Sequence, residues 1–139
     1  MKCRNPEKCR NEVLIKQALL EKDSKKVEAI LSKIRKRYAS GDKTVLTMTE
    51  HAHKRCVYRA VSTVDVVKVF KEGQAIEYSP GKSMCITLMG YTRENRPIHI
   101  VLASVADKKD WKIVTVYDPR TEAWRWEENY TKKVCFCSV

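Results

Sequence analysis

The chain has 139 residues, of which 43% are hydrophobic and 32% charged, and its formal net charge is +11. This length suffices for one soluble domain with a sizeable core, and the longest apolar runs, such as residues 100–103, are far too short to span a bilayer. We therefore expect no membrane partner. The charge fits a merely solvated surface, but it makes nucleic acid a better expectation than an acidic small molecule.

The cysteines and the first residues indicate the compartment. Six cysteines are unevenly spaced, and two of them, Cys56 and Cys85, fall inside apolar patterns, which argues for reduced thiols. Residues 1–4 begin a polar segment without the apolar stretch of a signal peptide. These observations predict a cytoplasmic protein.

Two helices are predicted in residues 1–44. Their apolar faces are separated by a break at Asp23–Ser24 and consist of Leu14, Ile15, Ala18 and Leu19, then Val27, Ile30, Leu31, Ile34 and Tyr38. Ser24 is the expected N-cap of the second helix. We interpret residues 1–44 as an N-terminal helical hairpin extension. Whether it packs on the rest of the chain, binds a partner or lies against phosphates stays open.

The next helix, within residues 49–61, carries the candidate working surface. Thr49 is its expected N-cap, and His51, Arg55 and Arg59 are spaced four residues apart, which places them on one stripe. Ala52 and Cys56 form an adjacent stripe that could press against a sheet. Cationic groups in one row repel one another unless an anion, a carboxylate or backbone carbonyls lie over them. The competing interpretation is structural, with an arginine capping loop carbonyls and the histidine inside the core.

The remaining pattern predicts mostly strands. After a helical segment at 63–71, strands are expected at 75–78, 84–91, 97–105 and 111–117, and residues 122–130 fit a strand or a short helix. The connections are short, so the predicted fold is α+β, with N-terminal helices packed on one side of an antiparallel meander sheet. We assign residues 45–130 to this core domain and residues 131–139 to a tail that contains cysteines.

Strand pairing adds two residues to the candidate surface. A loop centred near Lys108 would place His99 opposite Tyr117 across a hairpin, although a shift of one residue would remove this pairing. Strict alternation would put Ile113 and Thr115 on the same face as Tyr117. The alternative is that the histidine and tyrosine only satisfy each other in a half-buried position.

Several motifs in order resemble a bacterial family of small domains of unknown function. The opening signature is Thr49-x-His51-Ala52-x-x-Arg55-x-x-x-Arg59, followed by Glu72-Gly73, Leu88-x-Gly90, Arg96-Pro97-Ile98-His99-Ile100-Val101 and Ile113-x-Thr115-Val116-Tyr117-x-Pro119 with Trp124. The resemblance covers about residues 45–126, and Ala60 stands where the family commonly has glycine. The family looks related to RelE-like toxins, which pack N-terminal helices on an antiparallel sheet and often cleave RNA without a metal. The resemblance thus implies a RelE-like fold, RNA or the ribosome as partner, and an antitoxin protein.

Two functions fit these residues. In a metal-independent ribonuclease, His51 and His99 would serve as base and acid, Arg55 and Arg59 would stabilise the phosphorane, and Tyr117 would position or donate a proton. The alternative is a module that binds RNA, a ribosome or a protein partner without catalysis.

Four further cysteines raise the question of a metal. Cys3, Cys9, Cys135 and Cys137 provide the number of thiolates in a structural zinc site, but their spacings are not those of a zinc knuckle. Free terminal thiols are the simpler expectation, so we predict no cofactor, with zinc as the alternative.

Overall fold

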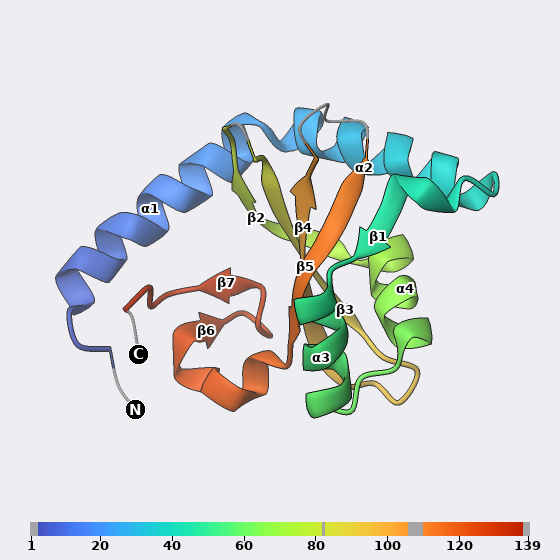
Figure 1. The fold of residues 1–139 in the computed structure, drawn as a ribbon. Coiled ribbons are helices and arrows are strands. Elements are labelled where there is room, and N and C mark those ends of the chain that lie inside the picture. Colours follow the sequence, from blue (N-terminus) through green and yellow to red (C-terminus); the bar gives the residue numbers. More distant parts are fainter. Residues whose placement is uncertain (1–2, 82, 106–109, 138–139) are drawn as a thin grey trace.

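The computed structural model describes residues 3–81, 83–105 and 110–137, and its elements form an α+β fold (Figure 1). Helices α1 (Pro6–Lys22) and α2 (Ser24–Ala39) precede the 3-10 turn η1 (Lys43–Val45), strand β1 (Leu46–Met48) and helices α3 (Glu50–Tyr58) and α4 (Thr63–Glu72). Strands β2 (Gln74–Ser79), β3 (Cys85–Tyr91), β4 (Pro97–Ser104) and β5 (Trp111–Tyr117) follow. The C-terminal segment, residues 119–137, contains the 3-10 helix η2 (Pro119–Arg125) and the short strands β6 (Trp126–Glu127) and β7 (Lys132–Lys133).

The main sheet is mixed, with the strand order β1-β5-β4-β3-β2. Strands β2 to β5 pair antiparallel, as the short connections predict, but β1 pairs parallel with β5, Leu46 opposite Trp111. The expectation of a purely antiparallel meander is therefore wrong at this edge. A strand of three residues carries no sequence signal for its direction, and β1 fills the edge of β5 that the hairpins leave unpaired.

The β4–β5 register confirms the predicted cross-strand pair. His99 lies opposite Tyr117 and Val101 opposite Thr115, whereas the connecting loop around Lys108 lies outside the described residues. A bulge follows, because Leu102 pairs with Ile113. The additional residue turns Ile113 into the main core, so it does not share a face with Thr115 and Tyr117 as strict alternation predicted.

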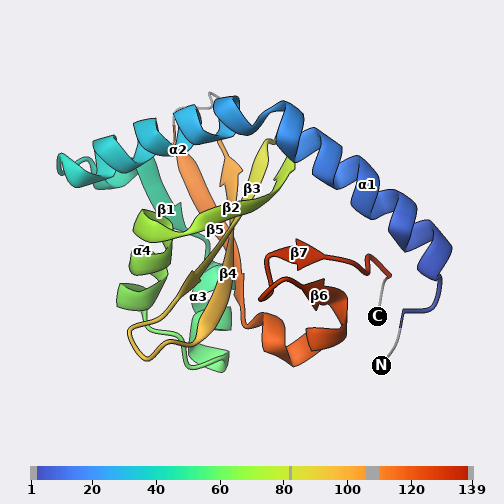
Figure 2. The same cartoon turned by 180° about the vertical axis from the view of Figure 1, so that it is seen from behind.

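Both faces of the sheet are covered. Helices α2, α3 and α4 pack on one face in a core that includes Val27, Leu31, Ile34, Ala52, Cys56, Val66, Val69, Phe70, Ile86, Leu88, Ile98, Ile100 and Leu102. A smaller cluster on the other face joins Ile76 and Met89 to Trp126 of the C-terminal segment. Figures 1 and 2 show this segment and helices α3 and α4 on opposite sides of the sheet. One-sided packing is therefore a second expectation that the structure corrects.

The first two helices form an arch rather than the predicted hairpin. Asp23 alone separates α1 from α2, and the pair forms one bent rod in which α2 lies across the sheet and α1 runs away from it, on the side of β6 and β7 (Figures 1 and 2). One residue is too short a connection for two helices to turn back on each other. Asp23, not Ser24, precedes α2, and its side chain makes no capping hydrogen bond. Since α2 buries Val27, Leu31 and Ile34 in the main core, this helix packs on the domain.

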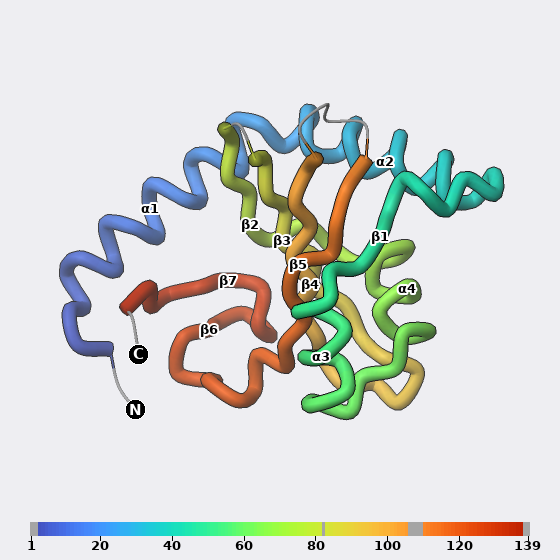
Figure 3. The backbone as a smooth tube through the Cα atoms, viewed as in Figure 1, coloured from blue at the N-terminus to red at the C-terminus, as the bar shows by residue number. Residues whose placement is uncertain are grey.

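The path of the chain brings its two described ends together. The sulfur atoms of Cys3 and Cys137 are 3.8 Å apart, and the tube in Figure 3 shows the C-terminal segment returning to the side of the molecule where α1 begins. Within the described residues, no helix is long and apolar enough to cross a membrane.

Candidate functional site

Helix α3 places the predicted cationic stripe beside strand β5. The hydroxyl of Thr49 accepts a hydrogen bond from the backbone N–H of Ala52 at 3.1 Å, which fixes the start of the helix as predicted. Ala52 and Cys56 are buried in the main core. Their burial sets the rotation of α3, so that the neighbouring stripe lies beside Thr115 and Tyr117, in the part of β5 that does not pair with β1.

A pocket of about 300 Å³ lies between α3, β5 and the C-terminal segment, and we call it the α3–β5 pocket. It is lined by His51, Arg55, Arg59, Thr115, Tyr117, Pro119, Thr121, Glu122, Arg125, Trp126 and Lys133. Four of the five side chains predicted to share a site therefore converge here: the whole stripe of α3 and Tyr117. The pocket is strongly cationic, with three arginines and a lysine against one glutamate.

His51 is the imidazole that lines the pocket. It is exposed, and the Nε of Arg55 donates to its Nε2 at 3.4 Å. In this geometry Nε2 is the nitrogen of His51 that accepts. His53 is also exposed but does not line the pocket.

Arg59 lines the pocket and also joins α3 to β5. Its Nη1 donates to the backbone carbonyl of Val116 on β5, which ties the end of α3 to the strand. Partial burial, and then the charge of Arg55, lower the pKa of Arg59. A lowered arginine pKa still leaves the group charged at neutral pH, so the N–H groups that do not bind Val116 can face an anion.

His99 lies behind the pocket wall and is fully buried. Its Nε2 is 2.7 Å from the carbonyl oxygen of Tyr130, and its Nδ1 is 3.2 Å from the hydroxyl of Tyr117. A carbonyl only accepts, so Nε2 carries the proton and Nδ1 accepts the hydroxyl proton of Tyr117. Burial lowers the pKa of His99 to about 4, so the ring is neutral near pH 7.

Tyr117 is held in place by aromatic neighbours as well as by this hydrogen bond. The ring of His99 meets those of Tyr117 and Trp126 edge-on, with centroids 5.1 and 4.3 Å apart. Burial raises the pKa of Tyr117, which keeps its hydroxyl protonated. The structure therefore brings His99 to Tyr117 but not into the pocket, and a direct acid or base role for His99 does not fit this position.

The opposite wall of the pocket is formed by residues of the C-terminal segment. Lys133, Arg125 and Trp126 come from the C-terminal segment, which had no assigned secondary structure. Arg125 is paired with Glu122 and donates to the carbonyl of Cys135. Strands of two residues give no periodic pattern, so the cationic and aromatic composition of residues 120–133 was the sole signal in the sequence.

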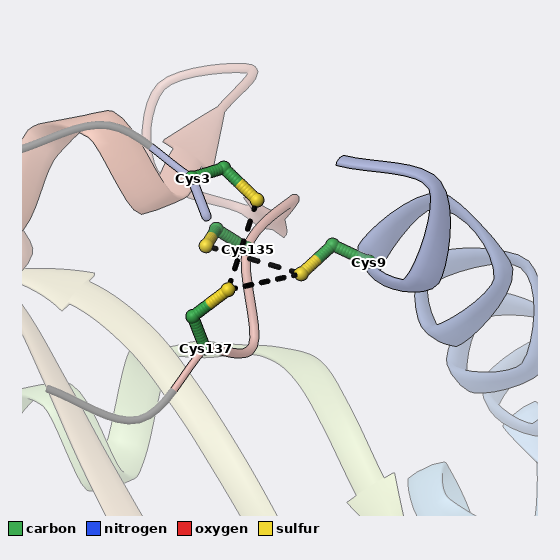
Figure 4. Close-up of side chains that lie close together, drawn as sticks. All are labelled: Cys3, Cys9, Cys135 and Cys137. Carbon is green, nitrogen blue, oxygen red and sulfur yellow. Dashed lines mark hydrogen bonds between the residues drawn. The ribbon is translucent and has the colours of Figure 1, made fainter. Parts of the chain in front are cut away.

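The four terminal cysteines form a thiol cluster at the foot of α1 (Figure 4). The sulfur atoms of Cys3, Cys9, Cys135 and Cys137 all lie within 4.8 Å of one another. The backbone N–H of Arg4 lowers the pKa of Cys137 to about 6, whereas desolvation and the neighbouring thiols raise that of Cys3 to about 12. The cluster thus brings together two cysteines from the start of the sequence and two from its end.

Comparison with known proteins identifies one family. No curated protein and no solved structure matches the chain. A family model matches residues 48–118, just over half of the chain, and this range contains His51, Arg55, Arg59, His99 and Tyr117 but none of the thiol cluster. By this match the chain belongs to the family described as a domain of unknown function, DUF4258.

Proposed function

We propose that the α3–β5 pocket binds a phosphate of an RNA chain and that the protein is a metal-independent, RelE-like ribonuclease. The convergence of His51, Arg55, Arg59 and Tyr117 on one pocket is the observation that carries this proposal. RNA cleavage without a metal needs an accessible base near the 2′-hydroxyl and fixed cations around the phosphorus, and these residues offer both.

His51 is the base in this mechanism. Its neutral imidazole takes the proton of the 2′-hydroxyl, and the 2′-oxygen attacks the adjacent phosphorus. The guanidinium groups of Arg55 and Arg59 carry the charge that develops on the equatorial oxygens, and Lys133 faces them from the other wall. The 5′-oxygen leaves with a proton from solvent, and the products are a 2′,3′-cyclic phosphate and a 5′-hydroxyl.

Tyr117 positions the substrate instead of releasing a proton. Its pKa is raised by burial, so forming the tyrosinate would be costly. The buried His99 accepts the hydroxyl proton and fixes the side chain against Trp126. His99 is thus a positioning residue in the proposal, whereas the sequence suggested an acid or base.

Cleavage of a 5′-labelled single-stranded RNA in buffer without added divalent cations tests the proposal. We expect cyclic-phosphate products with the wild-type protein, a loss of at least about one hundred-fold in rate with His51→Ala, the size of general base catalysis, and no loss with the matched control His53→Ala. Adding ribosomes to the same reaction would reveal whether they are the preferred partner, as in toxins with a cognate antitoxin. Equal cleavage by both histidine variants would refute the role of His51.

A binding module without catalysis is the second candidate, and one observation favours it. Among the described histidines, only His51 lines the pocket, so a second imidazole is not at hand to protonate the leaving oxygen. Such a module would bind RNA with strong salt dependence but leave it intact. Binding measured beside cleavage in the same samples separates the two candidates.

A further inference from the structure

We propose that Cys3, Cys9, Cys135 and Cys137 bind one structural zinc ion that joins the two ends of the chain. The site lies outside the matched family domain, and none of the observations that support zinc comes from the proposed ribonuclease. The number of thiols alone left this possibility weak, because the two pairs of cysteines are separated by more than one hundred residues of sequence. In the folded chain, however, the two pairs of cysteines lie together.

The distances fit a tetrahedral metal site. The sulfur of Cys9 lies 3.9 Å from that of Cys135 and 3.6 Å from that of Cys137, and the Cys3–Cys137 distance is 3.8 Å. A zinc ion bound by four thiolates at about 2.3 Å requires sulfur–sulfur distances of about 3.8 Å. Disulfide sulfurs would be only about 2.05 Å apart. None of the described cysteines forms such a bond.

The donor set favours zinc in a closed, structural role. Four thiolates without a carboxylate or imidazole suit a soft, tetrahedral ion, and they leave no open position for a substrate. Cys9 and Cys135 are buried, and Cys3 and Cys137 are half-buried, so the ion would be shielded from water.

Backbone groups around the sulfurs support the same interpretation. The N–H of Phe136 donates to the sulfur of Cys9 at 3.3 Å, and such outer hydrogen bonds orient ligands and stabilise thiolate charge. The carbonyl of Cys135 accepts from Arg125, which also lines the α3–β5 pocket. The thiol cluster therefore connects through one residue to the pocket wall.

The surrounding structure explains why an ion would be needed. Helix α1 buries only Cys9 and Val13, and it exposes Leu14 and Ile15. Strands β6 and β7 contribute two residue pairs to their sheet. Elements with so little buried surface need a further link, and a structural zinc supplies folding free energy directly.

Metal analysis of the full-length protein, purified without chelators, tests the proposal. We expect one zinc per chain, and the intense visible bands of a tetrahedral cobalt–thiolate centre after exchange with cobalt(II). Cys9→Ser should lose the metal and lower the melting temperature. The matched control Cys85→Ser, a half-buried thiol outside the cluster, should keep both.

Thiol titration decides the matter even if Cys9→Ser fails to fold. A mercurial reagent added to the wild-type protein should release zinc in step with the reaction of four thiols. Stoichiometric iron in place of zinc would overturn the identity of the ion. Metal-free protein with reactive cluster thiols, or with a disulfide between them, would overturn the site itself.

Discussion

Arg55 and Arg59 offer a comparison in which two neighbouring cations should behave differently on substitution. Both line the α3–β5 pocket, but Arg59 also donates to the carbonyl of Val116, whereas Arg55 contacts the exposed His51. Replacing each with alanine therefore removes one cation from the pocket in both cases, but breaks a link between α3 and β5 only at Arg59.

The expected loss of stability follows from that one hydrogen bond. A hydrogen bond from a charged donor contributes about 1.5–3 kcal/mol, and because the Arg59 side chain is partly exposed we take the lower end, about 1.5 kcal/mol. For a chain of this length this corresponds to a fall in melting temperature of roughly 4–6 °C. Arg55→Ala should leave the melting temperature within about 2 °C, since exposed substitutions change stability little.

The salt dependence of RNA binding measures the other role of these residues. Removing one cation that binds a phosphate should reduce the slope of log affinity against log salt by about 0.7 for a single strand. Both alanine variants should show this reduction, and Arg59→Lys should keep the slope while it weakens any cleavage that needs the guanidinium fork. An unchanged melting temperature for Arg59→Ala would refute a stabilising role for the hydrogen bond to Val116. An unchanged slope for both alanine variants would refute the proposal that the pocket binds a phosphate.

Three further predictions concern stability. The pKa of His99 is about 4 in the folded chain and near 6.5 in the unfolded chain, so between these values the unfolded chain binds one more proton than the folded chain. The folded state should therefore be up to about 3 kcal/mol more stable above pH 6.5, and this stability should be lost as the pH falls towards 4. Subtracting the denaturant-measured profile of His99→Asn isolates this effect, and parallel profiles would contradict it. Burial alone would raise the pKa of Asp118, but hydrogen bonds from Arg120 and Arg96 lower it to about 2. This carboxylate therefore adds stability that is lost between about pH 4 and pH 2. Asp118→Asn should flatten the dependence of the unfolding free energy on pH in this range. Thr49→Ala should cost about 1 kcal/mol in urea unfolding because it removes the cap of α3, and Thr49→Ser should restore it.

Local periodicity and short connections predicted the part of the site that lies on α3 and the central hairpin. Thr49 caps the helix, and Ala52 and Cys56 bury one stripe, as their spacing requires. The His99–Tyr117 pair also followed from the sequence, because a short hairpin fixes the register once the centre of its loop is known. Each of these predictions depends on residues close together in sequence.

The missed features depend on packing between distant residues. No periodic pattern in the sequence predicts three of these features: the parallel pairing of β1, the bulge that buries Ile113, and the pocket wall that contains Lys133. The burial of His99 could not be predicted from β4 alone, because the C-terminal segment covers that face of the strand. The segment itself was unreadable from a pattern, since its strands have two residues each.

The C-terminal segment connects the two proposals. It lies beyond the matched family domain, yet Trp126 and Lys133 form one wall of the α3–β5 pocket, and the carbonyl of Tyr130 holds the imidazole that positions Tyr117. The family domain therefore supplies the stripe of α3 and the face of β5, but not the wall that contains Trp126 and Lys133. Arg125 links this wall to the thiol cluster, because it donates a hydrogen bond to the carbonyl of Cys135. The proposed zinc ion would therefore act on the pocket wall through Arg125, although none of its four cysteines lines the pocket.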